Sequence, residues 1–350
     1  MNFLYLFFCP DRSLRTSVER EHFNRPEFEN VPPAFRRKAG FTILELLVAT
    51  TILALLMALI LSVISHTSTI WKRSADKIET FQAARMAFNL VTAKLSQATM
   101  NTYLDFDNPS VPTKFIRKAE LKFLSLPAGS IAGTVGTGQE IFFQAPGNLT
   151  RNSTQYGGLE GLLNACGYYV SFGSDASMKP GFITSANKYR YRLMQLLVPT
   201  ENNQIYNPNV AGRDWVATSA ANVMPVADNI IALIIRPQDP GANPPDLTPN
   251  SYTYDSAASF TGNQPLTSNQ MPPVIQVTMI AIDSSAAERL QKNSTQPTEI
   301  TSVLSGKFSN PASYDADIQA LELAFNQANP SIPYRIFNSA VPIRESKWTK

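Results

Sequence analysis

The segment RRKAGFTILELLVATTILALLMALILSVIS occupies residues 36–65. From Phe41 to Ile64 the one charged residue is Glu45, and about fifteen of the residues are Leu, Ile, Phe or Val. As an α-helix this run would be about 36 Å long, enough to cross a hydrocarbon layer about 30 Å thick. A core helix of a soluble domain rarely stays apolar on every face over such a length. The segment therefore predicts a transmembrane helix over residues 41–65.

Basic residues stand directly before the apolar segment, at Arg36–Lys38. Because Lys and Arg beside a membrane-spanning helix stay on the cytoplasmic side, this order predicts a cytoplasmic N-terminus. The rest of the chain, about 285 residues, would lie across the membrane. Trp71, which two basic residues follow, fits an anchor at the far interface. The pattern is typical of a single-pass membrane protein.

Glu45 is an ionisable side chain inside the apolar run. A carboxylate within a membrane segment is costly, so its presence indicates a function with an identifiable partner. The alternative is that Glu45, a short way past Lys38, reaches the lipid headgroups and has no partner. Taken alone, the residue leaves both interpretations open.

The octapeptide KAGFTILE, Lys38–Glu45, resembles the cleavage and methylation motif of type IV prepilins. In that motif a basic leader ends in Gly, and Phe-Thr-x-x-Glu and an apolar helix follow. The resemblance implies that residues 1–40 are a cytoplasmic leader and that a membrane-embedded prepilin peptidase cuts between Gly40 and Phe41. It also implies that this enzyme methylates the new amine of Phe41. Glu45 would then pair with that amine on a neighbouring subunit during filament assembly.

Physical chemistry fits these implied roles. Gly40 has no side chain to clash when extended backbone enters a protease. Pairing of the Phe41 ammonium with Glu45 lowers the cost of burying either charge in hydrocarbon, and it sets the axial register between subunits. The sequence departs from the family pattern at one place. Many major pilins have a helix-bending proline about twenty residues past the cleavage point, and this chain has Ser62 and its neighbours there. The departure argues against a major pilin and leaves a minor pilin open.

Helical periodicity continues beyond the membrane segment, through residues 66–99. Apolar residues recur there at steps of three and four, and no Pro or Gly occurs between Phe41 and Thr99. We therefore expect one helix from about Phe41 to about Thr99, whose distal half packs on a β-sheet. The residues of this stripe are Phe81, Ala84, Phe88, Val91, Leu95 and Ala98.

After residue 99 the composition changes to a loop-rich, β-rich body, residues 100–350. Apolar and alternating runs between Pro-, Asn- and Ser-rich loops predict an antiparallel sheet. In YRYRLMQLLV polar and apolar residues partly alternate, as on a half-buried strand, whereas NIIALIIR and VIQVTMIAI indicate central strands. The expected fold class is thus α+β and pilin-like, with a long N-terminal helix packed on an antiparallel sheet. The predicted elements are strands at Leu121–Leu126, Glu140–Ala145, Tyr168–Phe172, Tyr189–Val198, Asn229–Arg236 and Val274–Asp283, a helix at Ser313–Ala328 and a last strand at Tyr334–Ile343.

Two stretches of the body carry further resemblances. The strand Val226–Arg236, a loop and MPPVIQVTM are similar to the C-terminal half of J-type minor pseudopilins of type II secretion. The ending YRIFNSAVPIRESKW looks like the verrucomicrobial proteins called Verru_Chthon cassette protein C. Both imply a minor pseudopilin.

Composition argues against several other classes. His22 and His66 are the two histidines, so the body has none for a Ser-His-Asp, Cys-His or His-containing zinc site. The two cysteines make no disulfide framework, and Cys166 is most simply a small buried apolar residue. A net charge of +3 and scattered basic residues do not indicate a nucleic-acid partner. We therefore expect no enzyme activity, no cofactor and no resident metal.

One stretch leaves a metal alternative open. In YLDFDNPS the side chains of Asp105, Asp107 and Asn108 are possible calcium ligands, although an Asx turn explains the same residues.

The sequence thus predicts a minor pilin or pseudopilin-like structural subunit of a type II secretion or type IV pilus-like filament. Its expected partners are the prepilin peptidase and methyltransferase, other pilin or pseudopilin subunits, and the bacterial inner membrane, with the body in the periplasm or on a filament at the cell surface. The alternative is a periplasmic binding or enzymatic domain for which the helix is a tether. A tether needs neither Gly40 nor Glu45.

Overall fold

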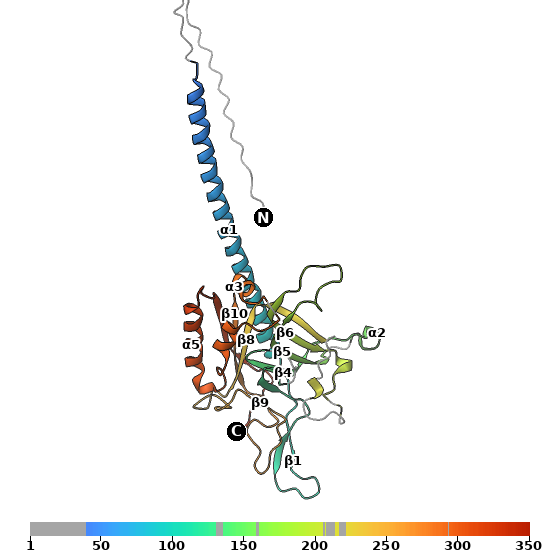
Figure 1. Cartoon of the computed structure of the whole chain (residues 1–350). Coiled ribbons are helices and arrows are strands. Elements are labelled where there is room, and N and C mark those ends of the chain that lie inside the picture. Colours follow the sequence, from blue (N-terminus) through green and yellow to red (C-terminus); the bar gives the residue numbers. More distant parts are fainter. Residues whose placement is uncertain are drawn as a thin grey trace, which may run out of the picture. The chain divides into compact units, whose positions relative to one another are not determined.

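The computed structural model describes residues 40–130, 136–158, 161–205, 207, 214–216, 222–292 and 294–350. The chain divides into two compact units, Met1–Ser62 and Val63–Lys350. Figure 1 labels the helices and strands along the chain. In the first unit the described residues are 40–62, and a helix begins there at Ile43. In the second, the continuation of that helix packs on antiparallel sheets. The expected α+β class, a long N-terminal helix with antiparallel β-structure, is confirmed.

The helices of the described residues are α1 (Ile43–Leu95), α2 (Ser153–Tyr156), α3 (Ser284–Leu290), α4 (Thr298–Leu304) and α5 (Tyr314–Gln327), with 3-10 turns at Thr200–Asn202, Asp214–Val216 and Pro311–Ser313. The strands are β1 (Tyr103–Phe106), β2 (Phe115–Lys118), β3 (Leu124–Pro127), β4 (Gln139–Pro146), β5 (Leu163–Ser174), β6 (Tyr189–Val198), β7 (Val223–Asp228), β8 (Ile230–Gln238), β9 (Tyr254–Asp255), β10 (Val274–Ile282) and β11 (Tyr334–Pro342).

Helix α1 is 53 residues long and unbroken, as the lack of Pro and Gly predicts. Its C-terminal end lies earlier than expected. The helix stops at Leu95, the chain turns, and the backbone N–H of Thr99 donates to the carbonyl of Gln144 at 2.8 Å. The expectation of a helix to about Thr99 is therefore wrong by one turn, because the final residues join the sheet instead.

Three sheets are present among the described residues. The largest has six strands in the order β7-β6-β5-β4-β3-β9, the second has the order β11-β10-β8, and β1 and β2 form a separate hairpin. All the ladder pairings are antiparallel. An isolated bridge between Gly138 and Leu233 brings the start of β4 against β8. Gly138 has φ +82°, and a Cβ there would collide with the carbonyl of Leu233, so this close approach requires glycine.

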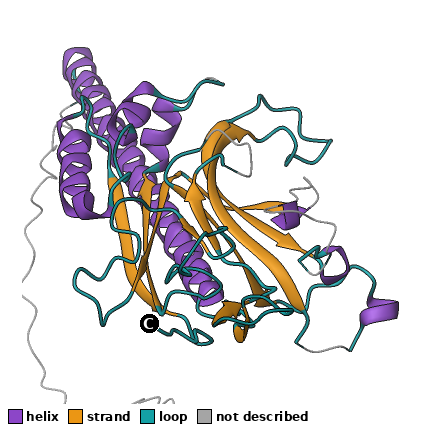
Figure 2. Cartoon of the chain, turned by 90° about the horizontal axis from the view of Figure 1, so that it is seen from below, coloured by secondary structure: helices purple, strands orange, loops and turns teal. Residues whose placement is uncertain are grey.

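The distal half of α1 supplies one side of the main core. Ala84, Val91 and Leu95 are fully buried, and Phe88 is 7% exposed. They belong to one apolar cluster with residues of the sheets, and Figure 2 shows the end of α1 lying across the strands. The expected packing of the stripe on a β-sheet is confirmed, with Phe81 half-buried at its upper end.

The three-stranded sheet lies between two helices. Neighbouring residues of a strand alternate between its faces, so Tyr334 and Phe337 of β11 point to opposite sides. The Tyr334 ring contacts Phe325 of α5, with centroids 5.6 Å apart. The Phe337 ring contacts Phe88 of α1, with centroids 5.8 Å apart. Helices α1 and α5 therefore cover opposite faces of this sheet.

The predicted strands are largely found, with instructive differences. Strand β6 matches its predicted bounds, but residues 190–194 are buried without alternation. Arg192 is 5% exposed because its guanidinium donates to Asp228 at 2.9 Å and to the carbonyl of Gly173 at 2.9 Å. The half-buried interpretation of β6 was therefore wrong for this part. The strand expected from Leu121 begins at Leu124.

The sequence did not predict several elements. Strand β7 contains Pro225, which normally argues against a strand, but β7 is at the edge of its sheet, where a missing N–H is tolerated. The short hairpin β1-β2, the two-residue strand β9 and the seven-residue helices α3 and α4 also carry weak local signals. Strand β10 is central in its sheet, as expected. Strand β8 was also expected to be central but lies at an edge, where the approach of β4 buries it.

Candidate functional site

The predicted processing segment forms a cap at the beginning of α1. The Thr42 backbone N–H and hydroxyl both donate to the Glu45 carboxylate, at 3.0 and 3.1 Å. In return, the Glu45 backbone N–H donates to the Thr42 hydroxyl at 3.2 Å. This reciprocal arrangement is a capping box, which satisfies N–H groups that the first turn of a helix leaves without partners.

Thr42 is the residue that the sequence interpretation missed. The signal was present, because Thr-x-x-Glu directly before an apolar run is the pattern of a capping box. The structure thus gives Glu45 a partner within its own chain. Both of its donors in Thr42 are neutral, so the capping box brings no cation to the carboxylate.

Gly40 and Phe41 lie outside the helix and are exposed, Phe41 to 84%. Apart from Gly40 itself and its chain neighbours, no heavy atom among the described residues lies within 4 Å of the place where a Cβ on Gly40 would be. Exposed backbone outside regular secondary structure is accessible to a peptidase. The basic residues Arg36–Lys38 and the rest of the predicted leader lie outside the described residues.

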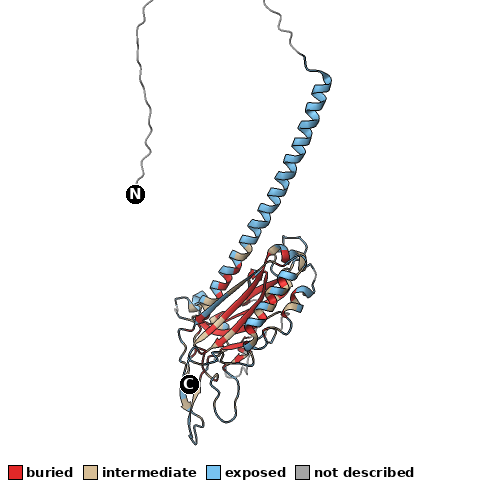
Figure 3. Ribbon diagram, turned by 90° about the vertical axis from the view of Figure 1, so that its left-hand side faces the viewer, coloured by how far each residue is buried: buried red, intermediate tan, exposed pale blue. Residues whose placement is uncertain are grey.

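Among the described residues, none buries the apolar part of α1. Every residue from 40 to 79 is exposed, and this part of the helix is pale blue in Figure 3. The exposed residues include large apolar ones throughout the segment. Among the described residues, α1 alone is long and apolar enough to cross a membrane, by length and composition. Burying this surface in hydrocarbon removes it from water without any protein partner. A membrane-anchored, single-pass chain fits these observations.

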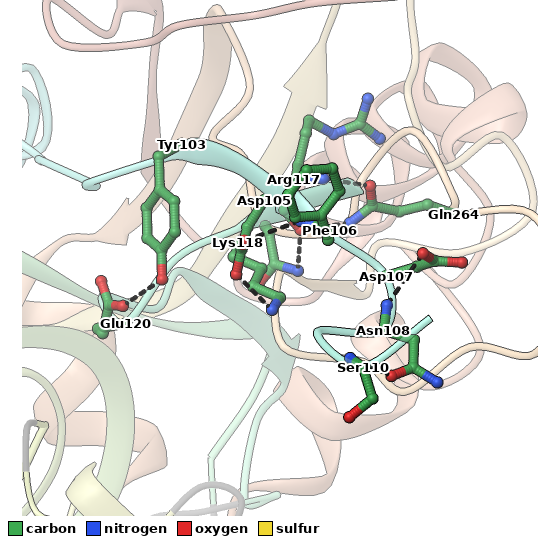
Figure 4. Close-up of polar contacts among 11 residues, drawn as sticks. Tyr103, Asp105, Phe106, Asp107, Asn108, Ser110, Arg117, Lys118, Glu120 and Gln264 are labelled. Atoms are coloured by element: carbon green, nitrogen blue, oxygen red, sulfur yellow. Dashed lines mark hydrogen bonds and ion pairs between the residues drawn. The ribbon is translucent and has the colours of Figure 1, made fainter. Parts of the chain in front are cut away.

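The possible calcium ligands lie at the β1-β2 hairpin (Figure 4). The carboxylate of Asp105 forms an ion pair with Lys118 at 2.6 Å. Asp107 accepts from the backbone N–H groups of Asn108, Thr113 and Lys114 and from the Thr113 hydroxyl. These bonds lower the pKa of Asp107 well below its usual range, the Thr113 hydroxyl contributing most.

Asn108 accepts from the backbone N–H of Ser110 at 2.9 Å, which is an Asx turn. The acidic side chains of the hairpin therefore fold the loop between β1 and β2. Within the described part of the chain, no group of three or more His, Cys, Asp or Glu side chains is placed to hold a metal ion.

Other reactive side chains are also accounted for. Cys166 is fully buried on β5, and desolvation raises the pKa of its thiol to about 12. A thiol with this pKa is protonated and inert at neutral pH. The expectation that Cys166 is a small buried apolar residue is confirmed. His66 is exposed on α1, while Cys9 and His22 lie outside the described residues.

Comparison with known proteins gives one family match. Residues 35–61 match the family described as prokaryotic N-terminal methylation motif, a match that contains Gly40, Phe41, Thr42 and Glu45. The chain is therefore prepilin-like at its N-terminus. No curated protein matches the chain.

Among solved structures, the chain is similar to a chain of the GspK-GspI-GspJ complex from the type 2 secretion system of enterotoxigenic Escherichia coli. The identity is 9%, with 57% of this chain and 88% of that chain covered, and the TM-score is 0.27.

Proposed function

We propose that this chain is a minor pilin or pseudopilin-like structural subunit of a type II secretion or type IV pilus-like filament. The observation that carries the proposal is the methylation-motif match at residues 35–61, located where an exposed apolar helix begins. A prepilin peptidase would cut after Gly40 and methylate the amine of Phe41. The exposure of both residues supports access by such an enzyme.

Glu45 is proposed as an assembly contact. The capping box satisfies hydrogen-bond donors of the first turn, yet it brings no positive charge to the carboxylate. In hydrocarbon an ionised carboxylate needs a cation, and cleavage creates one at the Phe41 amine. A neighbouring subunit would supply this amine, so that each Glu45 both caps its own helix and pairs with the next chain.

The body is proposed as structural, not enzymatic. The sequence contains no histidine after His66. Cys166 is buried and protonated, and the hairpin carboxylates Asp105 and Asp107 are engaged by Lys118 and by backbone N–H groups.

The proposed topology is a single pass through the bacterial inner membrane, with residues 1–40 in the cytoplasm and the body in the periplasm. The basic residues before the apolar segment support this orientation. Partners would be the peptidase and methyltransferase and other pilin or pseudopilin subunits.

The competing function is a membrane tether for a periplasmic binding domain. Gly40→Arg separates the two, because a large charged residue blocks the peptidase while leaving the apolar helix intact. In native membranes, Gly40→Arg should retain the full-length form and lose co-purification with other pilin-like subunits. Gly40→Ala, with a small side chain, is the matched control and should be processed in part. Unchanged co-purification by the uncleaved Gly40→Arg protein would contradict the filament proposal.

A further inference from the structure

A groove of about 320 Å³ lies between α1 and the edge strand β11. Its floor is apolar and its rim is cationic. No carboxylate belongs to its lining, which consists of Lys77, Ile78, Phe81, Gln82, Arg85, Arg335 and Phe337. We call this set the basic groove.

The cations of the basic groove are available for a partner. Lys77, Arg85 and Arg335 are exposed, and within the part of the chain that the structure describes none of them forms an ion pair. The guanidinium carbon of Arg335 lies 5.7 Å from the centroid of the Phe81 ring, which holds this cation over the apolar floor. Three unpaired cations around exposed apolar surface favour an occupant that is both acidic and partly apolar.

The other flank of α1 has the opposite character. A cleft of about 570 Å³ there is lined by Asp76, Glu79, Thr80, Ala83, Lys188, Asp228, Asn229, Ser284, Ser285 and Glu288. We call this set the acidic cleft.

Two of the four carboxylates of the acidic cleft are already engaged. Asp228 pairs with Arg192 at 2.9 Å and Glu288 pairs with Arg190 at 3.5 Å. Asp76 and Glu79 on α1 are exposed and form no ion pair among the described residues. The acidic cleft therefore has two free carboxylates, which outnumber the cation of Lys188.

Both surfaces lie at the same level of one helix. An α-helix turns by about 100° per residue, which places Asp76, Glu79 and Ala83 on one side of the buried stripe and Phe81 and Arg85 on the other. The same stretch of α1 thus has a cationic flank and an anionic flank. A parallel second copy can place its anionic flank against the cationic flank of the first.

We propose that the basic groove binds the acidic cleft of a second copy of this chain, with the two α1 helices side by side and parallel. The proposal rests on the proposed function, in which subunits meet through their N-terminal helices. Asp76 and Glu79 of one copy would meet the cations of the other, and the small side chains of Thr80 and Ala83 would pack over the apolar floor. Because each copy has one surface of each kind, the contact is heterologous and adds copies in a row.

The test uses charge reversal in the whole protein, expressed as the precursor and processed by the cell. Two differently tagged copies are expressed together in the native host and extracted in mild detergent. Lys77→Glu with Arg335→Glu reverses the groove, and Asp76→Lys with Glu79→Lys reverses the cleft. When both tagged copies carry the same reversal, co-purification of the tags should fall by roughly tenfold or more, because like charges then face each other. Lys347→Glu, an exposed change near the C-terminus, should leave co-purification unchanged.

The decisive experiment expresses the two kinds of reversed copy together. A groove-reversed copy keeps its acidic cleft, and a cleft-reversed copy keeps its basic groove. When the two are expressed together, both the reversed pair of surfaces and the wild-type pair are complementary, so co-purification should return. A return to the wild-type level supports the proposal. Unchanged self-association in either reversal, or loss without rescue on mixing, overturns it. A groove reversal that releases another pilin-like subunit and leaves self-association intact overturns it too.

A blot for the processed form separates this outcome from failure of the proposed function. If the mixing experiment overturns the groove contact while both reversed proteins are cleaved and still co-purify with other pilin-like subunits, the filament role stands and the groove contact alone is rejected.

Discussion

The ring of Phe88 on α1 lies against the ring of Phe337 on β11, with centroids 5.8 Å apart and ring planes 30° apart. This contact joins the distal half of the long helix to the edge of the three-stranded sheet. Phe88 is 7% exposed, whereas the residues of α1 up to position 79 are all exposed among the described residues. The same helix is therefore a core element in its distal half and an unpacked apolar surface in its first half.

This division predicts that the body folds without the membrane segment. A fragment of residues 68–350 keeps the whole buried stripe of α1 and both large sheets. It should be soluble, and its circular dichroism spectrum should show helix and strand with cooperative unfolding. The spectrum of an unfolded chain would show that the body depends on the apolar segment.

The Phe88 contact makes a prediction about stability in that fragment. Phe88→Leu keeps an apolar side chain of similar volume and should lower the free energy of unfolding by about 1 kcal/mol. Phe88→Asp places a carboxylate among apolar side chains and should lower it by at least about 3 kcal/mol. Urea unfolding measures both. Equal effects of the two substitutions would mean that Phe88 does not pack on the sheet.

Cys166 gives a prediction that depends on pH. Desolvation raises the pKa of its thiol to about 12, above the ordinary value near 9. Burial of the neutral thiol is therefore favourable below about pH 9, and this contribution is lost as the pH rises from about 9 towards 12. Maleimide should leave the folded protein unlabelled at pH 7 and label it after unfolding in urea.

The same reagent also counts cysteines. Cys9 lies in the proposed leader, so the denatured mature protein should show one reactive thiol and the precursor two. Two thiols in the mature form would place the cleavage site before Cys9.

The sequence predicted elements with strong local patterns. Unbroken periodicity gave α1, and the apolar runs gave β6, β8 and β10 nearly at their bounds. It did not predict β7, because an edge strand accepts Pro225 only in a tertiary setting that composition does not show. The burial of Arg192 likewise depends on Asp228 and on the carbonyl of Gly173, which the fold brings to it.

The candidate site shows the same limit. The prepilin-like motif predicts Gly40, Phe41 and Glu45 as the site residues, and that prediction needs no structure. The pattern Thr-x-x-Glu also predicts the hydrogen bonds from Thr42 to Glu45. The sequence interpretation did not use it, because the same residues belong to the prepilin-like motif. The basic groove was beyond sequence reasoning, because Arg335 and Phe81 come together only when β11 packs beside α1.

The capping box sharpens the test of Glu45. Glu45→Gln retains an acceptor for the N–H of Thr42 and removes the charge. If the carboxylate pairs with the Phe41 amine of a neighbour, this variant should be cleaved and inserted normally, while recovery of the assembly falls by roughly a hundredfold. Thr42→Ala is the control, since it weakens the cap and keeps the charge, and it should still assemble. Normal assembly of Glu45→Gln would assign the carboxylate to the cap alone.

The central claim is that the chain is processed as a prepilin, and the intact mass of the protein purified from native membranes tests it most directly. The account predicts a mature chain that begins at Phe41, lacks residues 1–40 and carries a methyl group on its α-amine. Fragmentation of the N-terminal peptide would place that methyl group on Phe41. A protein that still begins at Met1 in cells with an active prepilin peptidase would contradict the account.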